Sequence, residues 1–140
     1  MELVAGNVLT EDRALISGRE IALFAARTAD EKKGTDIVAY DVRGMTDITD
    51  YFVIVTAQSR AQIRAIYESI ARELKSSGLH KLGQEGNESG NWVLLDYADC
   101  VIHIFSPQLR EYYGLESLWG DAPKLNWSNE PAVKLQATGT

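Results

Sequence analysis

Residues 91–119 constrain the fold of this chain more than any other stretch of its sequence. Within it, 92–95 and 100–105 are apolar runs of strand length, separated by the turn-forming sequence Asp-Tyr-Ala-Asp at 96–99. Two such runs joined by a short polar turn predict an antiparallel β-hairpin. The stretch also concentrates aromatic, aliphatic and acidic side chains without nucleophile chemistry or a metal cage, which is typical of a binding surface.

A short helix is expected directly after this hairpin. Ser106 is a favourable N-cap, and Pro107 suits the first helical position because its fixed φ fits a helix and its missing N–H would have no partner there. Gly114 is expected to end this helix, and 115–119 to add one more turn packed near the sheet edge.

Two longer helices are predicted upstream from their start signals. Ser17 with Glu20, and Ser59 with Gln62, have the spacing of a capping box, in which both side chains bind free backbone N–H groups. Apolar residues recur at helical spacing after both signals. The second helix, the clearest in the sequence, should end at Gly78.

Strands are predicted between those helices. Residues 36–42 are rich in β-branched and aromatic side chains, and 51–56 form a continuous apolar run that suits a strand buried on both faces. The glycine-rich stretch 81–90 matches neither the Walker pattern nor the dinucleotide fingerprint. We expect it to be a connector or a hairpin rather than a phosphate-binding loop.

A charged row on the second helix leaves two interpretations open. Arg60, Arg64, Glu68 and Arg72 recur four residues apart, away from the apolar stripe. A solvated helix face is favoured over an anion site, because charged rows on helices are usually exposed to water.

Composition limits the class of protein. The 140 residues are 45% apolar and 24% charged, as in a single soluble globular domain. No stretch approaches the roughly 18 apolar residues that a membrane-spanning helix needs, and no export signal is evident. A net charge of -6 disfavours a protein that holds nucleic acid mainly through phosphates, so we expect a basic partner.

Cysteine and histidine suggest no catalytic or metal site. The single cysteine, Cys100, cannot form an internal disulfide, which fits a reducing compartment. Cys100 and His103 are three residues apart in a predicted strand, so their side chains should point to opposite faces. We expect Cys100 in the core and His103 in a structural role. With only His80 besides these, we expect no metal.

Four motifs occur in order along the chain. They are Thr-Asp-Tyr-Phe-Val-Ile at 49–54, Ser-Arg-Ala-Gln at 59–62, Gly-Asn-Trp-Val-Leu-Leu-Asp at 90–96, and the aromatic stretch 112–119. Together they resemble the Iojap family, the ribosomal silencing factors. The resemblance spans about 20–119, and the joint order of the motifs is more specific than any single one.

This resemblance implies a fold, a partner and a role. The fold is a single α/β domain with a mixed β-sheet flanked by helices, related to nucleotidyltransferases without their catalytic metal site. The partner is the large ribosomal subunit, bound through its fourteenth protein. Such a factor represses translation by sterically blocking small-subunit joining, especially when nutrients are limited. No cofactor is implied, and bacterial cytoplasm is favoured over plastid or mitochondrion.

Local sequence signals suggest the domain bounds, and the resemblance suggests an oligomeric state. We expect an N-terminal extension at 1–16, the ribosomal silencing factor-like domain at 17–120 and a poorly ordered C-terminal tail at 121–140. A homodimer is plausible, since an exposed hairpin strand could pair with a second copy or with a partner strand.

The alternative is a nucleotide-binding enzyme of the nucleotidyltransferase type. Such enzymes place two carboxylates two residues apart on a strand, where both reach one divalent cation. Here Phe52 stands two residues after Asp50, and Asp47 is three residues before it. The sequence therefore favours a non-enzymatic protein.

Candidate partner-binding residues lie in the hairpin and the segment after it. Trp92 is the first choice, because a desolvated aromatic anchor contributes on the order of 2 kcal/mol to the free energy of binding. Its alternative role is to cover the edge of the sheet. Asp96 and Asp99 could meet basic side chains or simply form the turn. The further candidates, of which the last could instead be core, are Tyr97, Tyr113, Leu118 and Trp119.

Overall fold

The computed structural model of the protein describes residues 16–128. In chain order the elements are α2 (Gly18–Glu31), β2 (Thr35–Asp41), β3 (Tyr51–Thr56), α3 (Arg60–Ser76), β4 (Gly83–Gly86), β5 (Trp92–Asp96), β6 (Cys100–Phe105), α4 (Pro107–Tyr113) and the 3-10 turn η1 (Leu115–Ser117). The strands form one five-stranded sheet in the order β2-β3-β6-β5-β4. Only β3 and β6 are parallel neighbours; the other pairs are antiparallel. The expected α/β domain with a mixed sheet is confirmed.

Serine side chains begin both long helices. Ser17 accepts the N–H of Glu20, whose carboxylate accepts the N–H of Ser17, so the capping box of α2 is complete. In α3, Ser59 accepts the N–H of Gln62, but the Gln62 amide oxygen accepts the N–H of Gln58 instead of that of Ser59. The second predicted box is therefore only half formed.

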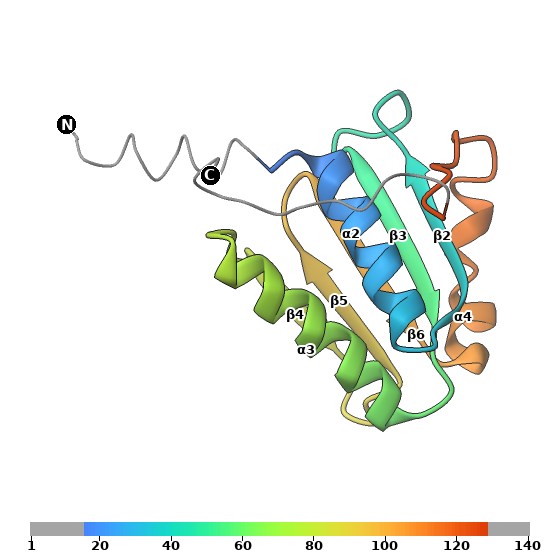
Figure 1. The fold of residues 1–140 in the computed structure, drawn as a ribbon. Helices are drawn as coiled ribbons and strands as arrows, with labels where there is room; N and C mark the ends of the chain where they lie inside the picture. The colour runs from blue at the N-terminus through green and yellow to red at the C-terminus, as the bar shows by residue number, and fades with distance from the viewer. Residues whose placement is uncertain (1–15, 129–140) are drawn as a thin grey trace.

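The two faces of the sheet are covered differently (Figure 1): α2 and α3 lie side by side over one face, and α4 lies on the other side. Strands β3 and β6 are buried at every residue, as predicted for 51–56. Side chains alternate along β6, so Cys100 enters the core under the helices while His103 contacts rings on the opposite face. Both expectations for this pair of residues are confirmed.

The glycine-rich stretch 81–90 contributes β4. This strand pairs antiparallel with β5 and forms one edge of the sheet. Of the two structures expected for this stretch, the hairpin is the one present. Among residues 16–128, no helix combines the length and apolar character needed to cross a membrane.

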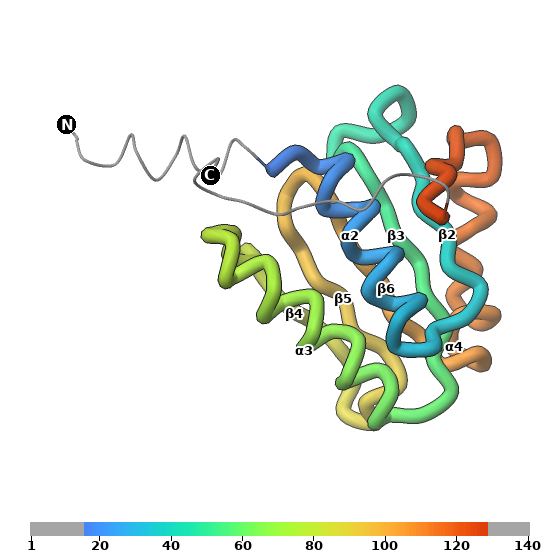
Figure 2. Tube along the Cα trace, in the orientation of Figure 1, coloured from blue at the N-terminus to red at the C-terminus, as the bar shows by residue number. Residues whose placement is uncertain are grey.

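Residues 121–128 run beside the opposite edge of the sheet, next to β2 (Figure 2). Leu125 donates its N–H to the carbonyl of Ala39 at 2.8 Å. The indole of Trp127 donates to the carbonyl of Ile37 at 3.2 Å. Both side chains pack against the core under the helices.

These contacts differ from the poorly ordered tail expected from residue 121 onward. The difference arises because free backbone groups of the edge strand β2 supply partners that composition does not reveal. The rest of the predicted tail, 129–140, lies outside the described residues, as does nearly all of the predicted extension at 1–16.

Arg110 ties α4 to β2 and β3. Its guanidinium donates two hydrogen bonds to the Glu116 carboxylate, both 2.9 Å, one to the Thr56 hydroxyl at 2.8 Å and one to the Asp36 carbonyl. The Arg110 side chain is only 10% exposed. Its hydrogen bonds hold the pKa of Glu116 below the usual value. One buried cation thus fixes the position of the short helix on the sheet.

We predict that Arg110→Met lowers the free energy of unfolding by about 2 kcal/mol, because charge-assisted hydrogen bonds are lost and their acceptors stay partly buried. Urea unfolding followed by circular dichroism measures this change. The control is Arg64→Met, which breaks a solvent-exposed pair with Glu68 and should lower the free energy of unfolding far less than Arg110→Met does. Equal losses in the two variants would contradict the anchoring role.

Candidate functional site

Six aromatic rings form a connected layer on the face of the sheet opposite α2 and α3. Neighbouring ring centroids lie 4.9 to 6.4 Å apart, the range of favourable aromatic contacts. Strands β3, β5 and β6 supply four rings, while α4 and the segment after η1 supply the others. We call this set the aromatic layer: Phe52, Trp92, His103, Phe105, Tyr113 and Trp119.

A hydrogen bond fixes the central pair of the layer. The Trp92 indole N–H donates to His103 Nδ1 at 3.0 Å, and the two rings stack with an interplanar angle of 18°. Burial lowers the pKa of His103 to about 4, so the imidazole is neutral near pH 7 and can accept this bond. His103 therefore has the structural role expected from the sequence, and Trp92 has a fixed orientation.

The layer reaches solvent along α4 and after η1. Tyr113 is exposed on one side and contacts Trp92 on the other, and Tyr112, which is 79% exposed, packs edge-on against Tyr113. Leu118 is 63% exposed, and Trp92 is half-buried. We call these four residues the aromatic rim: Trp92, Tyr112, Tyr113 and Leu118.

Tyr112 was not among the candidates chosen from the sequence. Its signal was present, since α4 buries none of its residues fully and two adjacent tyrosines end it. A short helix with no buried face places successive aromatic side chains toward solvent and toward the layer. The pair Tyr112 and Tyr113 could therefore have been selected together.

Strand β5 extends this face toward the hairpin turn. Trp92, Leu94 and Asp96 alternate along the strand on one face, and all three are half-buried. Asp96 also accepts the N–H of Ala98, so it stabilises the turn. Asp99 is exposed in the same turn. The turn-forming role proposed for aspartate is present at Asp96, and both carboxylates remain accessible in part.

Tyr97 lies away from the aromatic rim. It is 4% exposed and packs in the core between the sheet and the long helices. Side chains alternate at the end of β5, so the residue after Asp96 points to the other face. Burial raises the pKa of Tyr97 to about 12, and its hydroxyl is buried without a hydrogen-bond partner among the described residues. Tyr97 is therefore not positioned to share a partner with Trp92.

Trp119 belongs mainly to the packing of the sheet. Its ring meets Phe52 edge-on at 5.4 Å, and the indole nitrogen is buried without a partner in the part of the chain described. Phe52 is itself buried in the layer. The core role considered for Trp119 thus fits its position, although part of the ring remains exposed.

The residues weighed for metal and nucleophile chemistry are separated in space. Asp47 and Asp50 are exposed in the loop between β2 and β3. Burial raises the pKa of the Cys100 thiol, which lies under the helices away from His103. Within residues 16–128, no three or more His, Cys, Asp or Glu side chains are grouped so that they could hold a metal ion.

The chain is similar to several known proteins. A family model described as "Ribosomal silencing factor during starvation" matches residues 16–139. "Ribosomal silencing factor RsfS" of Bacillus subtilis is 39% identical over 105 residues, covering 75% of this chain and 89% of that protein. A crystal structure of a protein from Chromobacterium violaceum is 33% identical with a TM-score of 0.69, covering 86% of this chain and 95% of that chain. A more distant relative, "Mitochondrial assembly of ribosomal large subunit protein 1" of Mus musculus, is 30% identical over 92 residues, covering 64% of this chain and 40% of that protein.

We predict that the native protein loses stability relative to a His103→Gln variant as the pH falls from 7 to 5. The pKa of His103 is lowered in the folded state, so the unfolded chain binds the extra proton and stability falls between pH 6.5 and 4. The expected loss at pH 5 is about 2 kcal/mol. Glutamine can still accept the Trp92 hydrogen bond but does not titrate.

Urea unfolding at both pH values measures this difference. A His103→Gln variant with the same pH dependence as the native protein would contradict the buried, neutral imidazole.

Proposed function

The chain belongs to the ribosomal silencing factor family, and from this premise we propose that it represses translation by binding the large ribosomal subunit. The proposed contact is the fourteenth protein of that subunit, on the face that the small subunit meets. A bound factor there blocks subunit joining sterically, most of all when nutrients are limited. The aromatic rim is the observation that supports a docking surface.

The rim is suited to binding because its anchors are held in place before a partner arrives. Trp92 is fixed by His103, and Tyr113 rests on Trp92 and Phe105. Aromatic side chains lose little conformational entropy on binding, and less still when packing already restricts them. Tyr112 packs against Tyr113 and adds exposed apolar area, and Leu118 adds more at the end of η1.

Charge supports a basic partner. The chain carries 20 acidic and 14 basic residues. Asp96 follows Trp92 on the same face of β5, and Glu85 on β4 is exposed and pairs with Leu94 across the strands. Carboxylates around an apolar patch speed the encounter with a basic surface and fix its register more than they raise affinity.

Steric blocking needs binding alone, so we assign the protein no enzymatic activity. Its place of action would be the bacterial cytoplasm, where ribosomal subunits join, in keeping with its similarity to a bacterial relative. A homodimer is compatible with the edge strand β4, which pairs with β5 alone among the described strands.

Co-sedimentation with isolated large subunits tests the proposal. The intact protein should pellet with large subunits and not with small subunits, and should reduce formation of joined ribosomes when both are mixed. A protein that stays in the supernatant would refute the binding. Joined ribosomes that form normally on factor-loaded large subunits would refute the blocking.

We predict that the double variant Tyr112→Ser with Leu118→Ser weakens large-subunit binding at least about tenfold, because truncating exposed interface anchors costs roughly 1 kcal/mol or more each. The measurement is co-sedimentation across a range of protein concentrations. Both side chains are largely exposed, so the circular dichroism spectrum and urea midpoint should stay native. Trp92→Ala is a less clean test, since it would also leave buried His103 Nδ1 without its donor.

The control is Ile48→Ser, which truncates an apolar side chain that is 80% exposed in the loop between β2 and β3. This variant should bind like the native protein. If Ile48→Ser weakens binding as much as the double variant does, the rim is not the specific contact.

A further inference from the structure

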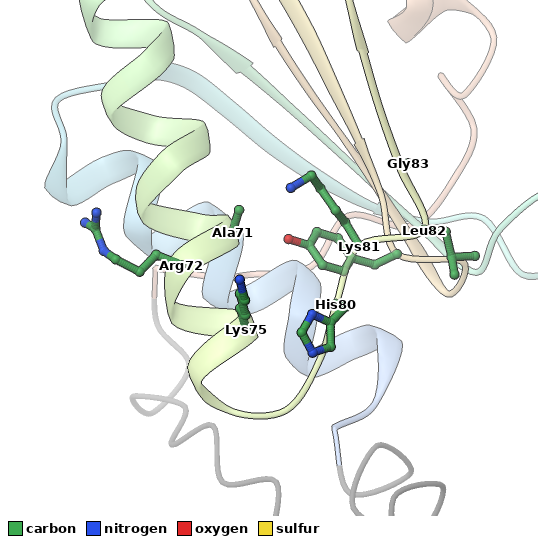
Figure 3. Close-up of a pocket in the computed structure, with 8 residues that line it drawn as sticks. Ala71, Arg72, Lys75, His80, Lys81, Leu82 and Gly83 are labelled. Carbon is green, nitrogen blue, oxygen red and sulfur yellow. The ribbon is translucent and has the colours of Figure 1, made fainter.

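A basic pocket lies between the C-terminal half of α3 and the segment that leads into β4 (Figure 3). Its volume is about 520 Å³, within the usual range for small-molecule sites. Lys75 comes from α3, as does Arg72, whose guanidinium points away from the other lining side chains, and the Lys81 side chain reaches back toward that helix from the following segment. The complete lining is Ala71, Arg72, Lys75, His80, Lys81, Leu82, Gly83 and Tyr97.

The charge of this pocket is opposite to that of the chain. Its lining holds three permanent cations and a histidine but no carboxylate, whereas the whole chain has a net charge of -6. Among residues 16–128, the ion pairs involve other side chains, and Arg72, Lys75 and Lys81 have none. The unpaired ammonium groups of Lys75 and Lys81 lie beside one hollow and repel one another, and an anion between them would relieve that repulsion.

Tyr97 gives the second, independent observation. It lines the pocket, it is 4% exposed, and its buried hydroxyl has no hydrogen-bond partner in the described part of the chain. A buried hydroxyl without a partner is unfavourable, and native proteins seldom leave one. The raised pKa of about 12 keeps this group protonated, so it can donate to an anionic oxygen.

The end of α3 explains only part of this arrangement. Carbonyl groups at a helix C-terminus favour nearby cations, which accounts for Lys75 in the last turn. That effect does not account for Lys81 in the following segment, for the hollow, or for the unpartnered hydroxyl of Tyr97. Arg72 also belongs to the charged row on this helix, for which an anion site was the less favoured interpretation of the sequence.

We infer that the basic pocket binds a small phosphate compound with at least two phosphoryl groups. Several cations and one neutral donor around a single hollow match a compact ligand with several negative oxygens. An extended polyanion fits less well, because the acidic surface of the chain would repel the rest of the strand. The inference is independent of the proposed function, since it concerns the face of the sheet opposite the aromatic rim.

Titration calorimetry of the full chain with inorganic pyrophosphate tests the inference. Saturable binding is expected, and Lys75→Gln with Lys81→Gln should raise the dissociation constant at least about tenfold. The charge-matched control is Lys32→Gln with Lys124→Gln, two exposed lysines outside the pocket, which should bind pyrophosphate like the native chain. Absence of saturable binding, or equal weakening in the two double variants, would overturn the inference.

The Tyr97→Phe variant tests whether the Tyr97 hydroxyl donates to the ligand or the residue serves in packing alone. It should weaken pyrophosphate binding while the urea midpoint of the ligand-free protein stays the same or rises, because an unpartnered hydroxyl is removed. Unchanged pyrophosphate binding, or a lower midpoint without ligand, would overturn the role given to this hydroxyl. A short single-stranded RNA that binds through Lys75 and Lys81 and that pyrophosphate fails to displace would overturn the choice of a small ligand.

Discussion

The arrangement of this protein depends on β6, a strand buried along its whole length between a parallel neighbour and an antiparallel one. Side chains alternate along β6, so Cys100 and two isoleucines lie under the helices, and His103 and Phe105 lie in the aromatic layer. His103 is the one ionisable group of the strand on that face, and burial is tolerable because it is neutral and bonded to Trp92. The hydrogen bond that gives buried His103 a partner therefore also orients Trp92, the main residue of the aromatic rim.

The aromatic layer also explains how so short a helix as α4 can hold the side chains proposed to contact a partner. A helix of 7 residues has too little internal hydrogen bonding to be stable alone, and α4 buries none of its residues fully. It is held by Arg110, which reaches β2 and β3, and by Tyr113, which rests on Trp92 and Phe105. Attachment at these two points holds the helix on the sheet and leaves Tyr112 exposed.

Local sequence signals predicted the elements of the fold well, because each depended on neighbouring residues. Ser17 and Glu20 are a complete box, the strand at 51–56 has the predicted bounds, and Ser106 and Gly114 cap α4 as expected. What the sequence could not give was long-range: residues 121–128 lie beside β2 because that edge has free backbone groups. The candidate site shows the same division. Trp92 and Tyr113 were chosen from their type and place in the chain, but the contact between their rings is tertiary and could not be read from the sequence.

Two adjacent residues of one turn lie on opposite sides of the sheet, one toward the aromatic rim and the other toward the basic pocket. Asp96 faces the aromatic side, and Tyr97 faces the helix side and lines the basic pocket. A partner docked on the rim would thus leave the pocket open, so the two sites need not compete for space. They are joined through the hairpin turn, where Asp96 accepts the N–H of Ala98 and Ala98 has a positive φ of 68°, and through Leu82 of the pocket, which donates its N–H to the Asp96 carbonyl at 2.7 Å. The turn is therefore one direct covalent path by which a pocket ligand could influence docking, because Asp96 and Tyr97 are consecutive in its backbone and lie on opposite faces of a closely packed sheet that transmits strain.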